Sequence, residues 1–225
     1  MKNNKLIFAA LISLILLPML SFAALAMSVA PQSNPPAPFN NEYYFQAVKL
    51  SPKWWSFRAK TNIRSGSLTS EGLDVQGTAE NWYVGGTGVY VGIDATKYTH
   101  FEMDVWGESQ RPSSLKVELY DDDNGDNQIA LDANGNPVND DRFVYLQKVD
   151  WDGWKRVSIP VAAFKDDNPG IGDDVWNPSK VNGKGGLIQI QFILLASTIT
   201  GEAHVKIKNI ELIRYDDRAP FVTPK

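Results

Sequence analysis

Residues 100–120 read HFEMDVWGESQRPSSLKVELY and contain two runs in which apolar and polar side chains alternate. In residues 100–106 the apolar side chains stand at positions 101, 103 and 105, and in residues 114–120 they stand at 115, 117 and 119. Successive side chains of a strand point to opposite faces of a sheet, so a period of two indicates a half-buried strand. This stretch therefore predicts two strands that each bury one face.

The same alternation recurs along the chain, and no stretch of ten residues between positions 42 and 218 shows a helical period. A change of parity in the last run predicts a β-bulge near Asn209. About ten short strands without helices predict an all-β fold of two packed antiparallel sheets, a β-sandwich or jelly roll. The remaining strands are expected at residues 143–149, 154–160, 187–196 and 204–214, with weaker ones at 43–49, 54–61, 73–77 and 87–93.

Two short segments are interpreted as turns. Asp152-Gly153 is a tight-turn dipeptide between the strands expected at 143–149 and 154–160, and it favours a hairpin there. The glycine-rich run at residues 85–88 follows no helix-initiating context and is too short to be a phosphate-binding loop, so it is also taken as a turn.

The N-terminus resembles a targeting segment. Residues 1–26 combine a basic start, an apolar run over positions 6–17 and a small-x-small end at Ala24 and Ala26, which predicts a secretory signal peptide. A retained membrane helix needs about 20 apolar residues, and Pro18 interrupts the run before that length. We therefore expect a secreted protein, extracellular or periplasmic, with no membrane insertion after signal removal.

The rest of the chain divides by composition. Residues 27–41 are rich in proline and carry no charge, which predicts a linker or disordered arm. Residues 42–217 are expected to form the β-sandwich, and residues 218–225 a loose C-terminal tail.

Composition excludes several classes of function. The formal charge is −4 and there is no cluster of Lys or Arg, which argues against a nucleic-acid partner. The chain has no cysteine, so thiol catalysis, thiolate metal sites and disulfides are absent. His100 and His204 lie far apart in sequence, which disfavours a histidine-rich metal site.

Five segments together resemble carbohydrate-binding modules of the galactose-binding-like jelly-roll type, and the resemblance covers about residues 65–214. It implies a β-sandwich, sugar binding and, in many members, a structural calcium ion near the chain ends. The last strand of such modules often has Asp where this chain has Asn209, which weakens that calcium site here. The segments are GLDVQG (72–77), DATKYTHFEMDV (94–105), KVELYDDD (116–123), WKRVSIPVAAF (154–164) and VKIKNIEL (205–212).

Sugar recognition needs flat aromatic rings beside polar side chains, because a pyranose has an apolar face and a belt of hydroxyls. If the strands of residues 100–106 and 114–120 are neighbours, their outward side chains make one polar-aromatic surface. The alternative is the wet outer face of a sheet. The stacking candidates are Trp82, Tyr83, Trp106 and Tyr120, and the hydrogen-bonding candidates are Glu102, Asp104, Glu118 and Gln191.

Residues 121–141 read DDDNGDNQIALDANGNPVNDD. An EF-hand is excluded, because Pro137 and Phe143 occupy positions that need Gly and Glu. A less regular structural Ca²⁺ site stays open beside the alternative of a solvated turn whose side chains satisfy backbone groups. Its candidate ligands are Asp121, Asp123, Asp126, Asp132 and Asp141.

The sequence therefore predicts a non-catalytic carbohydrate-binding protein that recognises a polysaccharide or cell-surface glycan. One alternative is a structural subunit of an extracellular layer or filament that associates with itself through the N-terminal arm. Another is a jelly-roll glycoside hydrolase, for which Glu102 and Glu118 on neighbouring strands are the one pair of carboxylates to assay.

Overall fold

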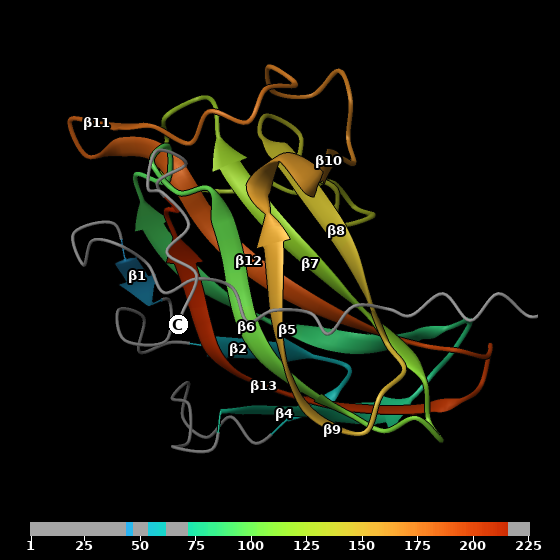
Figure 1. The fold of residues 1–225 in the computed structure, drawn as a ribbon. Coiled ribbons are helices and arrows are strands. Elements are labelled where there is room, and N and C mark those ends of the chain that lie inside the picture. The colour runs from blue at the N-terminus through green and yellow to red at the C-terminus, as the bar shows by residue number, and fades with distance from the viewer. Residues whose placement is uncertain (1–43, 47–53, 62–71, 216–225) are drawn as a thin grey trace, which may run out of the picture. The chain divides into compact units, whose positions relative to one another are not determined.

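The computed structural model describes residues 44–46, 54–61 and 72–215, and the statements below concern those residues. They form two antiparallel sheets packed face to face (Figure 1), with a single 3-10 turn at Val161–Ala163. The predicted all-β sandwich is confirmed. The expected signal peptide, proline-rich arm and C-terminal tail lie outside the described residues. Within the described part of the chain, no helix combines the length and apolar character that a membrane crossing requires.

The six-stranded sheet runs in the order β3-β4-β13-β6-β9, and β1 pairs with the end of β13. Its central strands are β13 and β6, which are long and keep their register over most of their length. The bounds are β1 Tyr44–Gln46, β3 Lys60–Thr61, β4 Leu73–Thr78, β6 His100–Gly107, β9 Gly153–Pro160 and β13 Glu202–Ile213.

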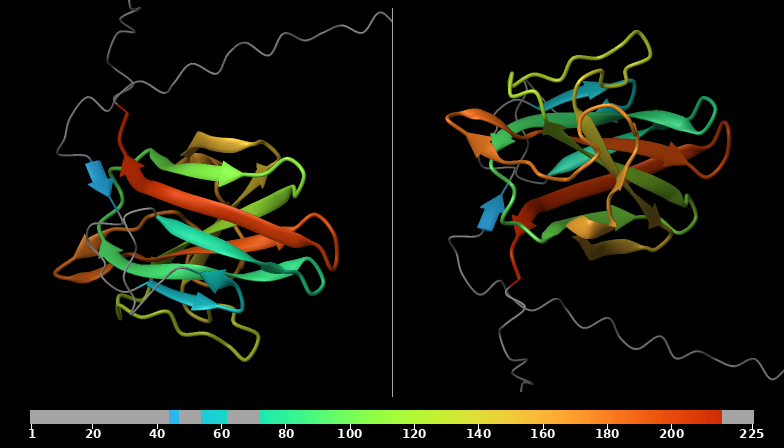
Figure 2. Two further views of the ribbon diagram at one scale, coloured as in Figure 1. Left: turned by 90° about the horizontal axis from the view of Figure 1, so that it is seen from below. Right: turned by 90° about the horizontal axis from the view of Figure 1, so that it is seen from above.

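The seven-stranded sheet runs in the order β10-β8-β7-β12-β5-β2, and β11 pairs with the start of β12. Figure 2 shows the two sheets as separate layers. The bounds are β2 Trp54–Phe57, β5 Tyr83–Ile93, β7 Ser113–Asp122, β8 Asp141–Val149, β10 Lys165–Asp166, β11 Lys180–Val181 and β12 Lys184–Ala196.

The apolar side chains of the alternating runs meet between the sheets, as the period of two predicts. Phe101 and Met103 of β6 belong to the same buried cluster as Leu115 and Val117 of β7, and none of the four is exposed to solvent. Burial of apolar surface is the main term that holds the two layers together, at about 25 cal/mol per Å² removed from water. The core thus fixes which side of each strand remains outside.

The bulge predicted near Asn209 is confirmed. The register of β13 against β6 shifts between Lys208 and Glu211, and Asn209 has φ 49°. Asparagine tolerates this left-handed conformation better than most residues. Residues beyond the bulge therefore regain the inward orientation that the change of parity had indicated.

Both turn interpretations are wrong in part. The chain bends at Asp152, but β8 belongs to the seven-stranded sheet and β9 to the six-stranded sheet, so this link crosses between layers and closes no hairpin. Residues 85–88 lie inside β5 and pair with β12. The glycines of that run therefore have a role in strand packing rather than in a turn.

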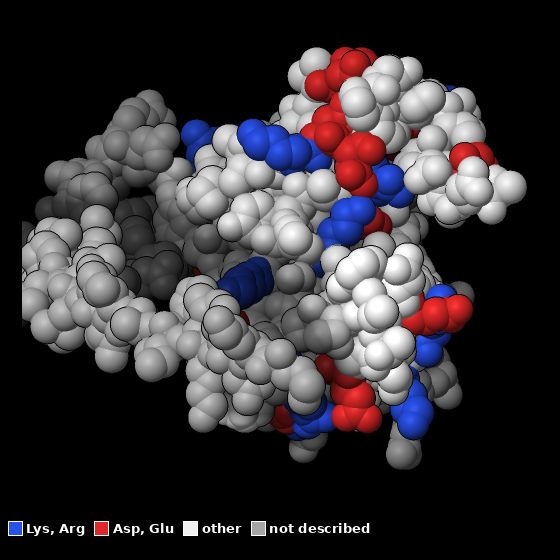
Figure 3. All heavy atoms as spheres, turned by 90° about the vertical axis from the view of Figure 1, so that its right-hand side faces the viewer, with Lys and Arg blue, Asp and Glu red and all other residues white. Residues whose placement is uncertain are grey.

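The loops that follow β7 and β10 come together at one end of the sandwich (Figure 1), and Asp and Glu side chains gather at the top of the view in Figure 3. Gly172 of the second loop lies against Asp123 of the first loop and Asp141 at the start of β8. This acidic end is therefore built from segments about 30–50 residues apart in sequence.

Candidate functional site

The two sheets separate the predicted sugar-binding residues into two groups. β6 lies in the six-stranded sheet and β7 in the seven-stranded sheet, so Glu102 and Trp106 face away from Glu118 and Tyr120 across the sandwich. The expected continuous surface is therefore wrong. Alternation determines which side of a strand leaves the core, but it carries no information on which strands pair.

The outer face of the seven-stranded sheet carries aromatic rings packed on glycine. Trp55 of β2 pairs with Gly88 of β5, and Phe57 pairs with Gly86. A Cβ atom at Gly88 would lie 2.6 Å from Cζ2 of Trp55, and one at Gly86 would lie 2.7 Å from Cζ of Phe57. Both rings thus occupy the space that a side chain at Gly86 or Gly88 would otherwise fill. Both are half-buried, and Tyr90, further along β5, is 45% exposed.

Polar side chains of β12 and β7 lie in register with these residues of β5. Gln191 of β12 pairs with Gly88 on one side and with Glu118 of β7 on the other. Its Cγ atom lies 3.0 Å from the Cβ position of Gly88, beside the Trp55 ring. In the next row Gln189 lies between Tyr90 and Tyr120. An aromatic strip and a strip of amides therefore lie side by side on one face.

Glu118 is the buried acid of this face, with only 2% of its surface exposed. The Tyr120 hydroxyl donates a hydrogen bond of 2.8 Å to it, and the Lys116 ammonium lies 2.9 Å from its other oxygen. Burial, and then the Glu118 charge, raise the pKa of Tyr120 far above its usual range. Burial opposes the charge of Lys116, but its hydrogen bonds to Asp167 and Glu118 outweigh that effect and raise its pKa.

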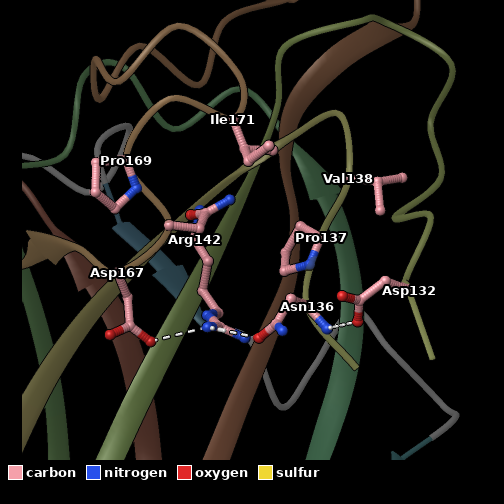
Figure 4. Close-up of a pocket in the computed structure, with 9 residues that line it drawn as sticks. Asp132, Asn136, Pro137, Val138, Arg142, Asp167, Pro169 and Ile171 are labelled. Atoms are coloured by element: carbon pink, nitrogen blue, oxygen red, sulfur yellow. Dashed lines mark hydrogen bonds and ion pairs between the residues drawn. The ribbon is translucent and has the colours of Figure 1, made fainter. Parts of the chain in front are cut away.

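The polar network leads into an open pocket of about 410 Å³. Arg142 of β8 lies 3.0 Å from Asp167 and donates a hydrogen bond of 3.4 Å to Asn136 (Figure 4). Lys116 also contacts Asp167, at 2.8 Å, so the pocket and the outer face of the sheet share these charged side chains. Apolar side chains border the pocket beside the charged pair, and they are Pro137, Val138, Pro169 and Ile171.

The predicted residues on the six-stranded sheet are bound to one another. The Arg156 guanidinium lies 2.7 Å from Glu102, 3.4 Å from Asp104 and 2.5 Å from Glu211. The Trp106 ring packs against the ring of His204, with 5.1 Å between the ring centroids. Glu102 also accepts hydrogen bonds from the hydroxyls of Ser158 and Tyr215, so its acceptor sites are largely occupied within the protein.

Tyr83 and Trp82 lie at the start of β5. Tyr83 is half-buried, and the guanidinium carbon of Arg58 lies 5.1 Å from the centroid of the Tyr83 ring. Trp82 precedes the strand with φ 65° and is 48% exposed. Tyr83 pairs with Leu195 of β12, which places it at the end of the same sheet as Gln191.

The binding role of the eight predicted residues stays a prediction. Four of the eight lie in the seven-stranded sheet, which carries the aromatic rings packed on glycine. They are Tyr83, Glu118, Tyr120 and Gln191. The stacking candidates chosen from the sequence do not include Trp55, Phe57 or Tyr90. Their signal was the glycine run in β5, which marks close packing once the segment is recognised as a strand.

The acidic residues proposed for calcium divide in a similar way. Asp123 and Asp141 have carboxylate oxygens within 4.8 Å of each other and of Asp173, a residue that the sequence interpretation missed. Asp126 and Asp132 lie outside that group, and their carboxylates accept hydrogen bonds from nearby backbone N–H groups. Asp121 is buried and accepts a hydrogen bond of 2.9 Å from the backbone of Asn177.

No family model and no curated protein matches the chain. Among solved structures, the chain is similar to a family 11 carbohydrate-binding module from Clostridium thermocellum in complex with a β-1,3-1,4-mixed-linked tetrasaccharide. The identity is 19%, the TM-score is 0.48, and the match covers 76% of this chain and 95% of that one.

Two further solved structures match at lower sequence identity. A family 29 carbohydrate-binding module matches at 11% identity and a TM-score of 0.39, over 75% of this chain and 90% of that one. An agarase matches at 10% identity and a TM-score of 0.45, over 77% of this chain and 25% of that one. Two of these three structures are carbohydrate-binding modules, the class that the sequence resembles. Since fold and function are separable, the site must be argued from this chain's own geometry.

Proposed function

We propose that this protein binds a carbohydrate without cleaving it, on the outer face of the seven-stranded sheet. The observation that carries the proposal is the packing of Trp55 and Phe57 on the glycines of β5, directly beside the amide of Gln191. An apolar ring surface next to a row of amides matches the two sides of a sugar ring, its C–H face and its hydroxyl belt.

Each side chain has a distinct part in this arrangement. Trp55 and Phe57 stand two residues apart on β2, which separates their Cα atoms by about 6.7 Å and offers two stacking positions. Gln191 and Gln189 can each donate and accept hydrogen bonds, as a hydroxyl requires. Glu118 already accepts from Tyr120 and Lys116, so it orients the face more than it binds ligand.

The geometry favours binding over hydrolysis. Glycoside hydrolases place two carboxyl groups roughly 5–10 Å apart across the scissile bond. Glu102 and Glu118 lie on opposite faces of the sandwich, so the proposed catalytic pair is wrong. We further infer from residues 1–26 that the protein acts outside the cytoplasm, where polysaccharides are met.

Affinity electrophoresis and calorimetric titration against soluble plant and microbial polysaccharides test the proposal. We expect wild-type retardation on at least one polysaccharide and at least a tenfold loss of affinity in Trp55→Ala, which corresponds to about 1.4 kcal/mol. Trp106→Ala is the matched control, because it removes an indole from the opposite sheet. Equal losses in both variants, or no binding by the wild type to any polysaccharide, would overturn the proposal.

The structural-subunit alternative depends on the N-terminal arm, which lies outside the described residues. Electron microscopy of the purified protein tests it. Filaments or sheets in the absence of any polysaccharide would favour this alternative over the binding function.

A further inference from the structure

Three aspartates from distant segments converge at the acidic end of the sandwich. Asp123 directly follows β7, Asp141 begins β8, and Asp173 lies in the segment between β10 and β11. One carboxylate oxygen from each lies within 4.8 Å of the other two. Asp141 also forms a second such group with Asp166 and Asp174.

Two of these carboxylates, one on buried Asp141 and one on half-buried Asp123, each have a solvent-shielded oxygen without a hydrogen-bond partner among the described residues. Asp141 is fully buried, and in both residues that oxygen is Oδ1. A Cβ atom at Gly172, which has φ 77°, would collide with both carboxylates, so the two side chains point to the same place against the bare backbone of that glycine.

The cluster also lacks a compensating positive charge. None of Asp123, Asp141 and Asp173 forms an ion pair with a Lys or Arg in the part of the chain that the structure describes, whereas nearby Asp167 pairs with both Lys116 and Arg142. An unpaired buried carboxylate is costly, so binding a cation here would lower the energy of the folded state.

We propose that Asp123, Asp141 and Asp173 bind one divalent cation, for which the chemistry favours calcium. Calcium takes six to eight oxygen ligands at 2.3–2.6 Å, so any two ligands lie within about 5 Å of each other, as these oxygens do. Magnesium requires near-ideal octahedral geometry at shorter distances, which a cluster from separate loops meets less easily. Asp121, a fourth carboxylate beside them, is buried and accepts a hydrogen bond of 2.9 Å from the backbone of Asn177.

The bound ion would join the β7–β8 loop to the segment between β10 and β11. That segment also contributes Pro169 and Ile171 to the pocket beside Arg142. The site is distinct from the calcium site that the family resemblance implies, since none of its ligands lies near the chain ends. It does not depend on the proposed sugar binding.

Thermal unfolding of the full chain, freed of metal by a chelator, tests the site in CaCl₂, MgCl₂ and EDTA. At a calcium concentration about 100 times Kd, the wild-type Tm rises by about 5–10 °C relative to EDTA. Asp141→Asn removes the calcium response and, because it removes an unpaired buried charge, has a higher Tm in EDTA than the wild type. Asp132→Asn, in the same loop but outside the cluster, keeps the full response.

Titration calorimetry with CaCl₂ measures binding directly and covers the case in which Asp141→Asn does not fold. We expect one ion per chain and at least a tenfold weaker Kd in Asp173→Asn, a variant that keeps the fold because the side chain it changes is exposed. The absence of calcium binding up to millimolar concentration, or an equal response of the wild type and both cluster variants, would overturn the site.

Discussion

The indole of Trp55 lies against the backbone of its register partner Gly88, at a distance that leaves no room for a Cβ atom on that residue. Trp54, the preceding residue, points the other way and stacks on Phe192 in the core at 6.2 Å between ring centroids. Two adjacent tryptophans therefore point to opposite faces of one strand. Substituting each in turn separates the effect on stability from the effect on ligand binding.

Trp54→Ala is expected to destabilise the fold by about 3–5 kcal/mol, because it leaves a cavity in the core. Trp55→Ala is expected to change the free energy of unfolding much less while removing the sugar-stacking surface. Urea unfolding and calorimetric titration with the best polysaccharide separate the two effects. A larger loss of stability in Trp55→Ala than in Trp54→Ala would contradict this assignment.

Gly88→Ala is expected to displace the Trp55 ring, since the new Cβ atom would lie 2.6 Å from it. Such overpacking costs about 1–3 kcal/mol, and the affinity for polysaccharide should fall with it. Ser56→Ala, at an exposed position on β2 next to Trp55, serves as the control. Unchanged affinity in Gly88→Ala would show that the ring does not need its present position.

Tyr120→Phe is expected to destabilise the protein by about 1–3 kcal/mol, because Glu118 loses the hydroxyl that donates to it. Lys116 still pairs with Glu118 in this variant, so the face keeps its charge balance. Denaturant unfolding gives the difference. A neutral result would mean that water replaces the hydroxyl, contrary to the burial of both side chains.

Arg156→Met is expected to cost about 3–5 kcal/mol, because it leaves Glu102 and Glu211 buried without their cation. Polysaccharide affinity should stay at the wild-type level, since this network lies on the opposite sheet. Unfolding experiments and affinity electrophoresis on the folded fraction check both statements. Loss of binding in folded Arg156→Met would move the binding face to the six-stranded sheet.

The strands were predictable because each buries one face, and the alternation in residues 100–106 and 114–120 records that burial directly. Sheet membership was not, because it depends on pairing between distant segments. The link after β6 and the link at Asp152 both cross between layers, although the second carries a hairpin dipeptide. This is why Glu102 and Glu118, close in sequence pattern, lie on opposite sides.

The candidate sites follow the same rule. The acidic loop was visible in the sequence, but Asp173 joins Asp141 only through the return of the chain after β10. Trp55 was visible as one of an aromatic pair, but its packing on Gly88 requires the pairing of β2 with β5. Composition indicates which kinds of site the chain can form, and tertiary contacts determine which residues come together in each site.

Both stacking rings come from β2, a strand of four residues at the border of its sheet that pairs, among the described strands, with β5 alone. Short border segments detach at a lower free energy than the interior of a sheet. Transient fraying of this one segment would disperse the aromatic platform while every other strand stayed paired, so ligand affinity should decline on warming well before the sandwich melts. Conversely, an occupied platform should slow amide hydrogen exchange in these four residues more than anywhere else in the sheet.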